Sequence, residues 1–127
     1  MRIVQLQAFL CAILERMEVL IEAQVELYGC IARTHDNLRK SGFNKITKEH
    51  ISTTLRLLDT KWQKFEENHE RLLDIYRDEE KKHDYHLKDF LGQAEDMYVQ
   101  QRAVLLEMEE TIARDKAREI AKPITGT

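Results

Sequence analysis

Residues that interrupt regular structure are scarce in this chain. Its 127 residues include one proline and four glycines. A β-rich or α/β domain of this length needs more turn residues, so both classes are disfavoured. Charged side chains make up 34% of the sequence, a composition typical of long helices. The length corresponds to one domain with a moderate core.

Cysteines are also few, and Cys11 and Cys30 are the only two. If both lie on one straight helix, 19 steps separate them by roughly 28 Å, far beyond the reach of a disulfide. Two reduced thiols favour a reducing compartment, so we expect an intracellular protein, either cytoplasmic or nuclear.

Long hydrophobic runs are missing as well. No stretch of 18 uncharged apolar residues occurs, so no transmembrane span is predicted. Residues 4–14 are apolar and follow Arg2, as in a signal peptide. Gln5 and Gln7 interrupt that stretch, however, and no small-residue cleavage site follows it, so we expect no signal peptide.

Charge of one sign does not dominate, since the net charge is −3. No global field therefore draws the whole protein to nucleic acid or to an anionic membrane. One basic patch stands out, and it could contact RNA phosphates or an anionic surface. The simpler interpretation is that its cations complement a helix end and keep the protein in solution. Only Phe43 is interleaved with it, so base stacking is poorly supported. The patch comprises Arg33, Arg39, Lys40, Lys45 and Lys48.

The most informative stretch covers residues 51–76. Large apolar residues recur there at alternating steps of four and three, the heptad spacing that keeps one helix stripe against a partner helix. It contains the only tryptophan, whose large ring needs covering. We therefore take this stripe as the organising core, formed after Ile51 by Leu55, Leu58, Trp62, Phe65, His69, Leu72 and Tyr76.

A first helix is predicted over residues 2–40, with a heptad seam from Ile3 to Leu38. Gln24 and Thr34 are polar residues in this seam, and we interpret them as positions where the seam is open to solvent. The alternative is that a buried Gln24 fixes the register or the oligomeric state of the helices. Gly42 suits a left-handed cap at the end of this helix. Thr47 suits the N-cap of a second helix over residues 48–79, with Ile46 and Ile51 as a hydrophobic staple.

Residues 77–84 contain no apolar side chain, so the chain should turn there, although a continuous helix is the alternative. A third helix is predicted over residues 85–119, with Asp84 as its N-cap. After Pro123, residues 123–127 should fray. Residues 1–122 then form a single all-α domain, an elongated antiparallel three-helix coiled-coil bundle.

The first and third helices have apolar arcs that are broader than a two-stranded coiled coil uses. A lone three-helix bundle would not cover them, which predicts a dimer. The candidate interface consists of their outer rows: Leu14, Ile21, Tyr28, Leu91, Tyr98 and Leu105.

Signatures of catalysis are missing. The sequence has no nucleotide-binding loop, no nucleophile elbow and no zinc-type Cys/His spacing. His83, His86, Asp84 and Asp89 offer metal ligands, but they lie in a solvated turn without a closed set of four. His69 could act as a pH switch, but we interpret it as a core-edge histidine beside Glu66 or Glu70. We therefore expect no enzyme, no metal, no cofactor and no small-molecule substrate.

One family resemblance emerges from these residues. LDTKWQKFEENHERL (58–72) resembles the leucine, tryptophan, phenylalanine–glutamate and histidine–glutamate pattern in N-terminal helical Gag regions of insect-type LTR retrotransposons. HDYHLKDF (83–90), followed by Glu95, Tyr98 and Gln101, is similar to the next segment there. The resemblance covers residues 14–108 and implies an all-helical, self-associating domain without an active site. The chain lacks a second capsid domain, a zinc knuckle and a protease motif, so an isolated Gag domain and a domesticated Gag-derived protein are both open.

These observations support three hypotheses about function. The first is a self-association module whose partner is itself, as a homodimer or a higher oligomer. The second is a heterotypic adaptor that receives a helix of another protein in an apolar groove. The third is a weak binder of RNA or of an anionic surface through residues 33–48.

Overall fold

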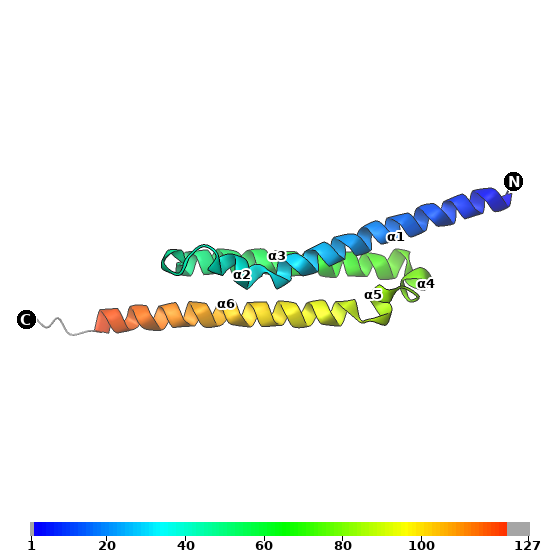
Figure 1. Cartoon of the computed structure of the whole chain (residues 1–127). Helices are drawn as coiled ribbons and strands as arrows, with labels where there is room; N and C mark the ends of the chain where they lie inside the picture. The colour runs from blue at the N-terminus through cyan, green and yellow to red at the C-terminus, as the bar shows by residue number, and fades with distance from the viewer. Residues whose placement is uncertain (1, 122–127) are drawn as a thin grey trace, which may run out of the picture.

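The computed structural model describes residues 2–121, and this part of the chain consists of helices and their connections, without a strand (Figure 1). The predicted all-α class is therefore confirmed. The predicted tail at residues 123–127, like the domain boundary at residue 122, lies outside the described residues. The elements are α1 (Arg2–Ala32), α2 (Thr34–Arg39), the 3₁₀ turn η1 (Phe43–Lys45), α3 (Lys48–Ile75), α4 (Arg77–Glu80), α5 (Asp84–Leu87) and α6 (Phe90–Ala121).

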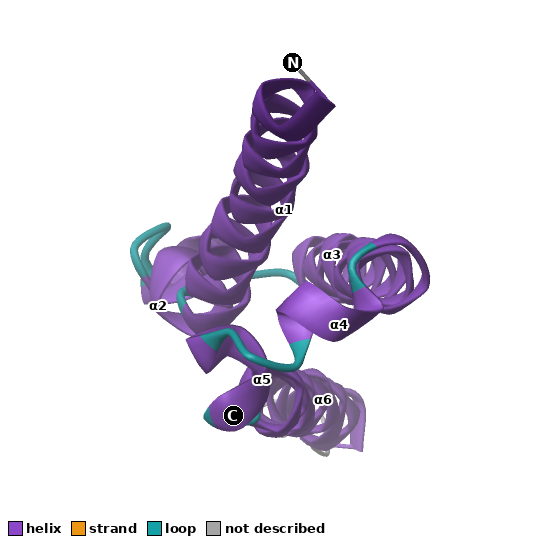
Figure 2. Cartoon of the chain, turned by 90° about the vertical axis from the view of Figure 1, so that its right-hand side faces the viewer, coloured by secondary structure: helices purple, strands orange, loops and turns teal. Residues whose placement is uncertain are grey.

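Three long helices, α1, α3 and α6, contact one another along the molecule. Figure 1 shows that α3 runs opposite to both α1 and α6, so α1 and α6 point in the same direction. The beginning of α1 projects past the turn formed by α4 and α5, and the end of α6 projects past the opposite turn. In the view along the molecule, α1 leans away from α3 and α6 (Figure 2). The long helices are therefore staggered, and each end of the molecule carries one helix that extends beyond the others.

The predicted first connection is confirmed in part. Gly42 has a φ of 91°, in the region that favours glycine, but its ψ of 137° is not left-handed helical and the C-cap of α2 is Lys40, so the predicted left-handed cap was wrong. The Thr47 hydroxyl accepts a hydrogen bond from the His50 backbone N–H at 3.1 Å, so its role as N-cap of α3 is confirmed. Ile46 packs against the hydrophobic cluster that contains Ile51, as the staple predicts.

The first predicted helix is not one regular helix. It is interrupted at Arg33, between α1 and α2. The Thr34 hydroxyl donates to the Cys30 carbonyl at 3.1 Å, a bond to the preceding turn that bends helices. The His35 N–H, next to this irregularity, donates to Oε1 of Gln101 on α6 at 2.9 Å. The irregular turn therefore supplies a backbone N–H that donates a hydrogen bond to a side chain of α6.

The second connection differs from the prediction in its boundaries. The second helix ends at Ile75 rather than residue 79, because Tyr76 leaves helical geometry and its ring packs into the core. The third predicted helix is divided into α5 and α6. The cap of α5 is His83, whose Nδ1 accepts from the Tyr85 N–H, so the prediction of Asp84 as cap was wrong. At α6, Asp89 adopts a φ of 50° and its carboxylate accepts from the Gly92 N–H at 3.2 Å.

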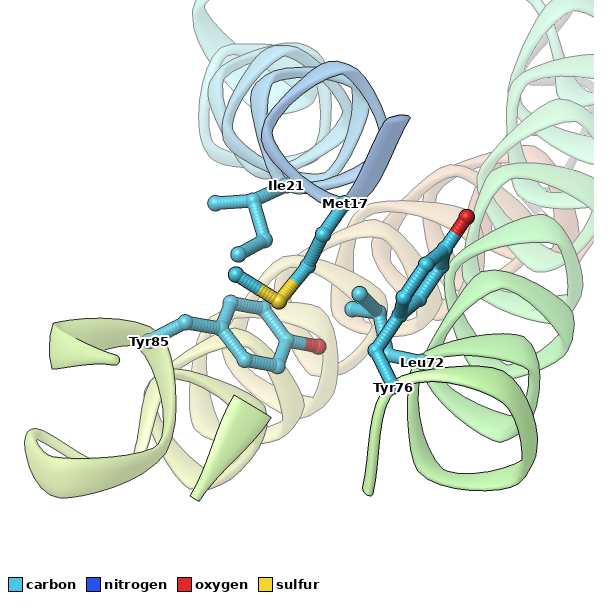
Figure 3. Packing of buried hydrophobic residues seen from close by; sticks show 5 residues of the cluster. All are labelled: Met17, Ile21, Leu72, Tyr76 and Tyr85. Carbon is cyan, nitrogen blue, oxygen red and sulfur yellow. The ribbon is translucent and has the colours of Figure 1, made fainter. Parts of the chain in front are cut away.

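The core consists of two clusters that lie one after the other along the molecule. Near the α4–α5 turn, five side chains from α1, from the end of α3 and from α5 meet, as Figure 3 shows: Met17, Ile21, Leu72, Tyr76 and Tyr85. Toward the α2–α3 turn, the second cluster comprises Ile31, Leu38, Ile51, Leu58 and Leu105. The second cluster draws on α1, α2, α3 and α6. Together the two clusters cover the middle of the molecule but neither projecting end.

Candidate interaction surfaces and a buried polar junction

The first segment of α1 is an apolar helix that the described chain covers only near its end, where Ile13 packs against the first core cluster. We call residues 3–14 the α1 overhang. Ile3 is 72% exposed, Phe9 is 64% exposed and Leu10 is 50% exposed. The same seam continues into the core at Met17, which is 3% exposed. The predicted heptad stripe is therefore continuous in sequence, but its first three members, Ile3, Leu6 and Leu10, have no partner among residues 2–121.

The exposed apolar surface of the α1 overhang is comparable to the largest apolar patches on monomers. Six big apolar side chains contribute: Ile3, Val4, Leu6, Phe9, Leu10 and Leu14. Fully burying one aliphatic side chain is worth about 1.5–3 kcal/mol, which corresponds to roughly 60–120 Å² each. Six half-exposed side chains therefore present on the order of 300–400 Å², within the range of the largest patches found on monomers, which are often functional.

A second apolar surface lies at the opposite end of the molecule. We call it the α6 groove, and it consists of two neighbouring hollows that share Ile46 and Ile112. One, of about 400 Å³, is also lined by Val104, Glu107, Met108, Thr111 and Asp115. The other, of about 520 Å³, is also lined by Thr47, Lys48, Glu49, Ala113, Lys116, Ala117 and Ile120. Ile120 is 80% exposed, so this end of α6 is uncovered as well.

The six predicted interface residues do not share one outer surface. Ile21 is 6% exposed and Leu105 is 0% exposed, and both belong to the core clusters. Tyr28 is half-buried against Phe90, with ring centroids 5.3 Å apart. Leu91 and Tyr98 are also partly buried, and only Leu14 is exposed, at 42%. The outer rows that the sequence assigned to a partner chain are thus mostly covered within this chain, because α1 and α6 contact each other as well as α3.

The predicted organising residues on α3 do lie at its contacts with other helices. Leu58, Phe65, Leu72 and Tyr76 are buried, and Leu55 and Trp62 pack against the second cluster. Trp62 stacks on Phe65 at 5.4 Å and on Tyr98 at 5.0 Å between ring centroids.

Tyr98 also anchors α6 to α3 through its hydroxyl, which donates to Oδ1 of Asp59 at 2.7 Å. Burial, together with this hydrogen bond, raises the pKa of Tyr98. The aromatic stack and the hydroxyl contact therefore join the same two helices.

A polar junction is buried where α1, α3 and α5 meet. Gln24 is 0% exposed, and its Nε2 donates to the Phe65 carbonyl at 2.8 Å and to the Tyr85 hydroxyl oxygen at 3.2 Å. The Tyr85 hydroxyl also lies 2.8 Å from Nδ1 of His69. The interpretation of Gln24 as a seam position open to solvent was therefore wrong. Thr34 is 7% exposed, so the same interpretation was wrong there.

His69 is held by this junction rather than by a neighbouring carboxylate. Its hydrogen-bond partner is Tyr85, and not Glu66 or Glu70 as the sequence suggested. Burial lowers the pKa of His69, although the charge of Glu80 opposes that effect. Burial raises the pKa of Tyr85 to about 12. Near neutral pH both groups are therefore uncharged.

Glu80 is a charged residue that no sequence pattern singles out. It lies in an all-charged run, yet its side chain is 0% exposed and its Oε1 is 3.2 Å from Nδ1 of His86. Its Oε2 has no hydrogen-bond partner among the described residues. Glu80, His69, His86 and Asp89 all line a half-open cleft of about 430 Å³. Hydrophobic periodicity cannot reveal such a residue, because its burial depends on how the turn folds back.

The turn residues that offered metal ligands have separate partners. His83 contacts Oε1 of Glu18 at 2.9 Å, His86 contacts Glu80, and Asp89 caps α6. No group of three or more His, Cys, Asp or Glu side chains within residues 2–121 is arranged to hold a metal ion.

The five predicted basic residues are all exposed and lie around the first turn. Arg33 is at the α1–α2 irregularity, Arg39 ends α2, Lys40 follows it, Lys45 is in η1 and Lys48 begins α3. Cys11 and Cys30 are both unpaired thiols on α1, with Cys11 exposed and Cys30 partly buried. Among the described helices, none is long and apolar enough to cross a membrane.

Comparison of the chain with protein-family models, with curated proteins and with solved structures finds no match. The resemblance to Gag regions therefore stays a prediction that rests on the quoted residues.

Proposed function

We propose that this chain is a non-enzymatic self-association module, a Gag-like scaffold whose α1 overhang brings copies of the protein together. The observation that carries the proposal is the continuation of one heptad seam from buried Met17 to exposed Leu10, Leu6 and Ile3. A helix with such a stripe is stabilised when a second surface covers it. The resemblance to Gag regions implies the same role.

The charge distribution supports a protein partner for this segment. Between Arg2 and Glu15 the α1 overhang carries no charged side chain. Two copies of the chain can therefore approach there without like-charge repulsion or the burial of an unpaired charge. Its side chains include Phe9, and aromatic residues are enriched at the centres of protein interfaces.

The size of the surface sets the expected strength. A patch on the order of 300–400 Å² is below the roughly 800 Å² per partner of a standard stable interface. We therefore expect association in the micromolar range, which dilution reverses. An assembly module that works at high local concentration needs no tighter contact.

Light scattering behind a sizing column, repeated across a tenfold dilution, tests this proposal. We expect a mass above that of one chain at high concentration and a decrease toward it on dilution. The double variant Leu6→Glu, Leu10→Glu should be monomeric throughout. Matched controls are Leu57→Glu and Val99→Glu, which change side chains that are 56% and 57% exposed elsewhere on α3 and α6. A wild-type monomer at every concentration would overturn the proposal.

A monomeric result would favour the heterotypic alternative, in which a helix of another protein covers the same overhang. Binding to RNA or to an anionic surface is the remaining alternative. It predicts salt-dependent retention of the unmodified protein on RNA or on anionic vesicles, lost when Arg39, Lys40 and Lys45 are changed to glutamate.

A further inference from the structure

We infer that copies of this chain associate head to tail, with the α1 overhang of one copy seated in the α6 groove of the next. The inference rests on the proposed function and specifies its geometry. It replaces pairing of like surfaces with a contact between two different surfaces of the same protein.

The two surfaces lie at opposite ends of one elongated molecule (Figure 1). The overhang of α1 projects from one end and the end of α6 projects from the other. When a second copy is placed end to end with the first, its α1 overhang lies alongside the projecting part of the first copy's α6. Within one chain α1 and α6 already contact each other and point the same way. The intermolecular contact would thus repeat a helix pairing that the fold already contains.

The groove is long enough for the overhang. The overhang from Ile3 to Leu14 spans eleven steps, or about 17 Å at 1.5 Å per residue. The α6 residues that line the groove run from Val104 to Ile120, which is sixteen steps, or about 24 Å. The parallel register with Arg2 of one copy beside Glu107 of the other lies within this length and places Leu14 near Ile120.

The charges agree with this register. Arg2 is the only charged residue in the first fourteen. The hollow at the Glu107 end of the groove is lined by Glu107 and Asp115 and by no basic residue. The single cation would therefore face Glu107 at the end of the contact where the register places it, in a hollow without a basic residue.

Pairing of the overhang with itself explains less of the molecule. In a two-fold dimer the same patch meets itself, and the α6 groove at the far end stays uncovered. Head-to-tail contact covers both apolar surfaces at once. The assembly then keeps one unused overhang at one end and one unused groove at the other. Growth therefore continues to an open chain unless the rotation between copies closes a ring.

Mixing two variants, each with one blocked end, tests the inference. The first, Leu6→Glu with Leu10→Glu, blocks the overhang. The second, Ala113→Glu with Ile120→Glu, blocks the groove at exposed positions, which should leave the fold intact. Circular dichroism and thermal unfolding verify that both variants fold. Ile75→Glu, at a residue that is 64% exposed at the end of α3, is the matched control and should associate like the wild type.

Light scattering then distinguishes the possibilities. We expect each blocked variant to be monomeric alone, and an equimolar mixture to form a 1:1 dimer that does not grow, while the wild type forms larger species with concentration. If the groove variant still associates alone and mixing restores nothing, the overhang pairs with itself, and the head-to-tail inference fails while the proposed function stands. A monomeric wild type would overturn both.

A charge exchange tests the register. Arg2→Glu in the groove-blocked variant should weaken its 1:1 association with the overhang-blocked variant about fivefold to tenfold, in a salt-dependent way. Glu107→Arg in the overhang-blocked partner should restore it. An unchanged affinity, or a loss that Glu107→Arg does not restore, would contradict the proposed register.

Discussion

Tyr85 and His69 share a hydrogen bond in a buried network that also contains Gln24. The Tyr85 hydroxyl lies 2.8 Å from Nδ1 of His69, and its oxygen accepts from Nε2 of Gln24 at 3.2 Å. The Tyr85 hydroxyl can then donate its proton to Nδ1 of His69, which requires a neutral imidazole with its proton on Nε2. A charged His69 would present an N–H to that proton instead of a lone pair, so protonation of His69 weakens the junction between α1, α3 and α5.

Acid should weaken this junction. Burial lowers the pKa of His69 in the folded protein below 6.5, so the unfolded chain takes up the proton first as the pH falls. Stability is then fully present above pH 6.5 and decreases as the pH falls toward the lowered pKa. His69 is only partly buried, so we expect a loss of a few tenths to about 1 kcal/mol between pH 7.5 and 5.5. Urea unfolding at both pH values measures it.

His69→Gln is the matched variant for that measurement. It removes the titrating group while the other four histidines remain, so the difference between the two proteins isolates His69. The variant should lose less stability on acidification than the wild type. An equal loss in both proteins would assign the pH dependence to other groups.

Gln24 should tolerate an apolar replacement better than a charged one. Its Nε2 makes two hydrogen bonds, each worth about 1 kcal/mol, but its buried Oε1 has no partner within the described chain and costs a similar amount. Gln24→Met should therefore change the free energy of unfolding by less than about 1 kcal/mol. Gln24→Glu should cost about 2–4 kcal/mol, because a carboxyl at this site must be buried charged or take up a proton. Chemical unfolding compares the two, and similar costs would contradict this account.

Two helical glycines should respond in opposite ways to alanine. A Cβ on Gly92 would clash with the carboxylate of Asp89, the residue that caps α6, so Gly92→Ala must displace the cap. We expect it to cost about 1–2 kcal/mol despite the higher helix propensity of alanine. A Cβ on Gly29 would meet only the end of the flexible Arg33 side chain at 2.9 Å. Gly29→Ala should therefore be neutral or stabilising by up to about 1 kcal/mol. Thermal unfolding tests the pair, and a neutral Gly92→Ala would show that the cap can move cheaply.

Hydrophobic spacing was enough to predict the long helices and much of the core. The α3 stripe led to Leu58, Phe65 and Leu72 in the interior, and local chemistry identified Thr47 as a cap. Spacing reports which residues share a helix face. It does not report which neighbour covers that face, and for this reason Ile21 and Leu105 were assigned to a partner chain although this chain buries them.

The polar features depended on tertiary structure that no local pattern contains. Gln24 finds its partners 41 and 61 residues away, and Glu80 is buried only because the α4–α5 turn folds back. A polar residue in a heptad seam, or one acidic residue in a run of charged residues, looks the same in the sequence whether its side chain is solvent-exposed or buried. The projecting ends are likewise a matter of helix stagger, which heptad spacing leaves undetermined.

The seam of α1 allows a final prediction that compares one side chain inside the core with one outside it. Leu10 and Ile31 lie on the same heptad stripe, yet Leu10 is 50% exposed and Ile31 is 0% exposed. Ile31→Ala should cost about 2–5 kcal/mol, because it removes buried methyl groups and leaves a cavity. Leu10→Ala should change stability by less than about 0.5 kcal/mol, provided that unfolding is followed at a concentration low enough to keep the chain monomeric. If Leu10→Ala cost as much as Ile31→Ala under those conditions, the overhang would be packed within its own chain and unavailable to a second copy. At high concentration the wild type should gain stability from association and Leu10→Ala should not, which separates the role of Leu10 in assembly from its role in folding.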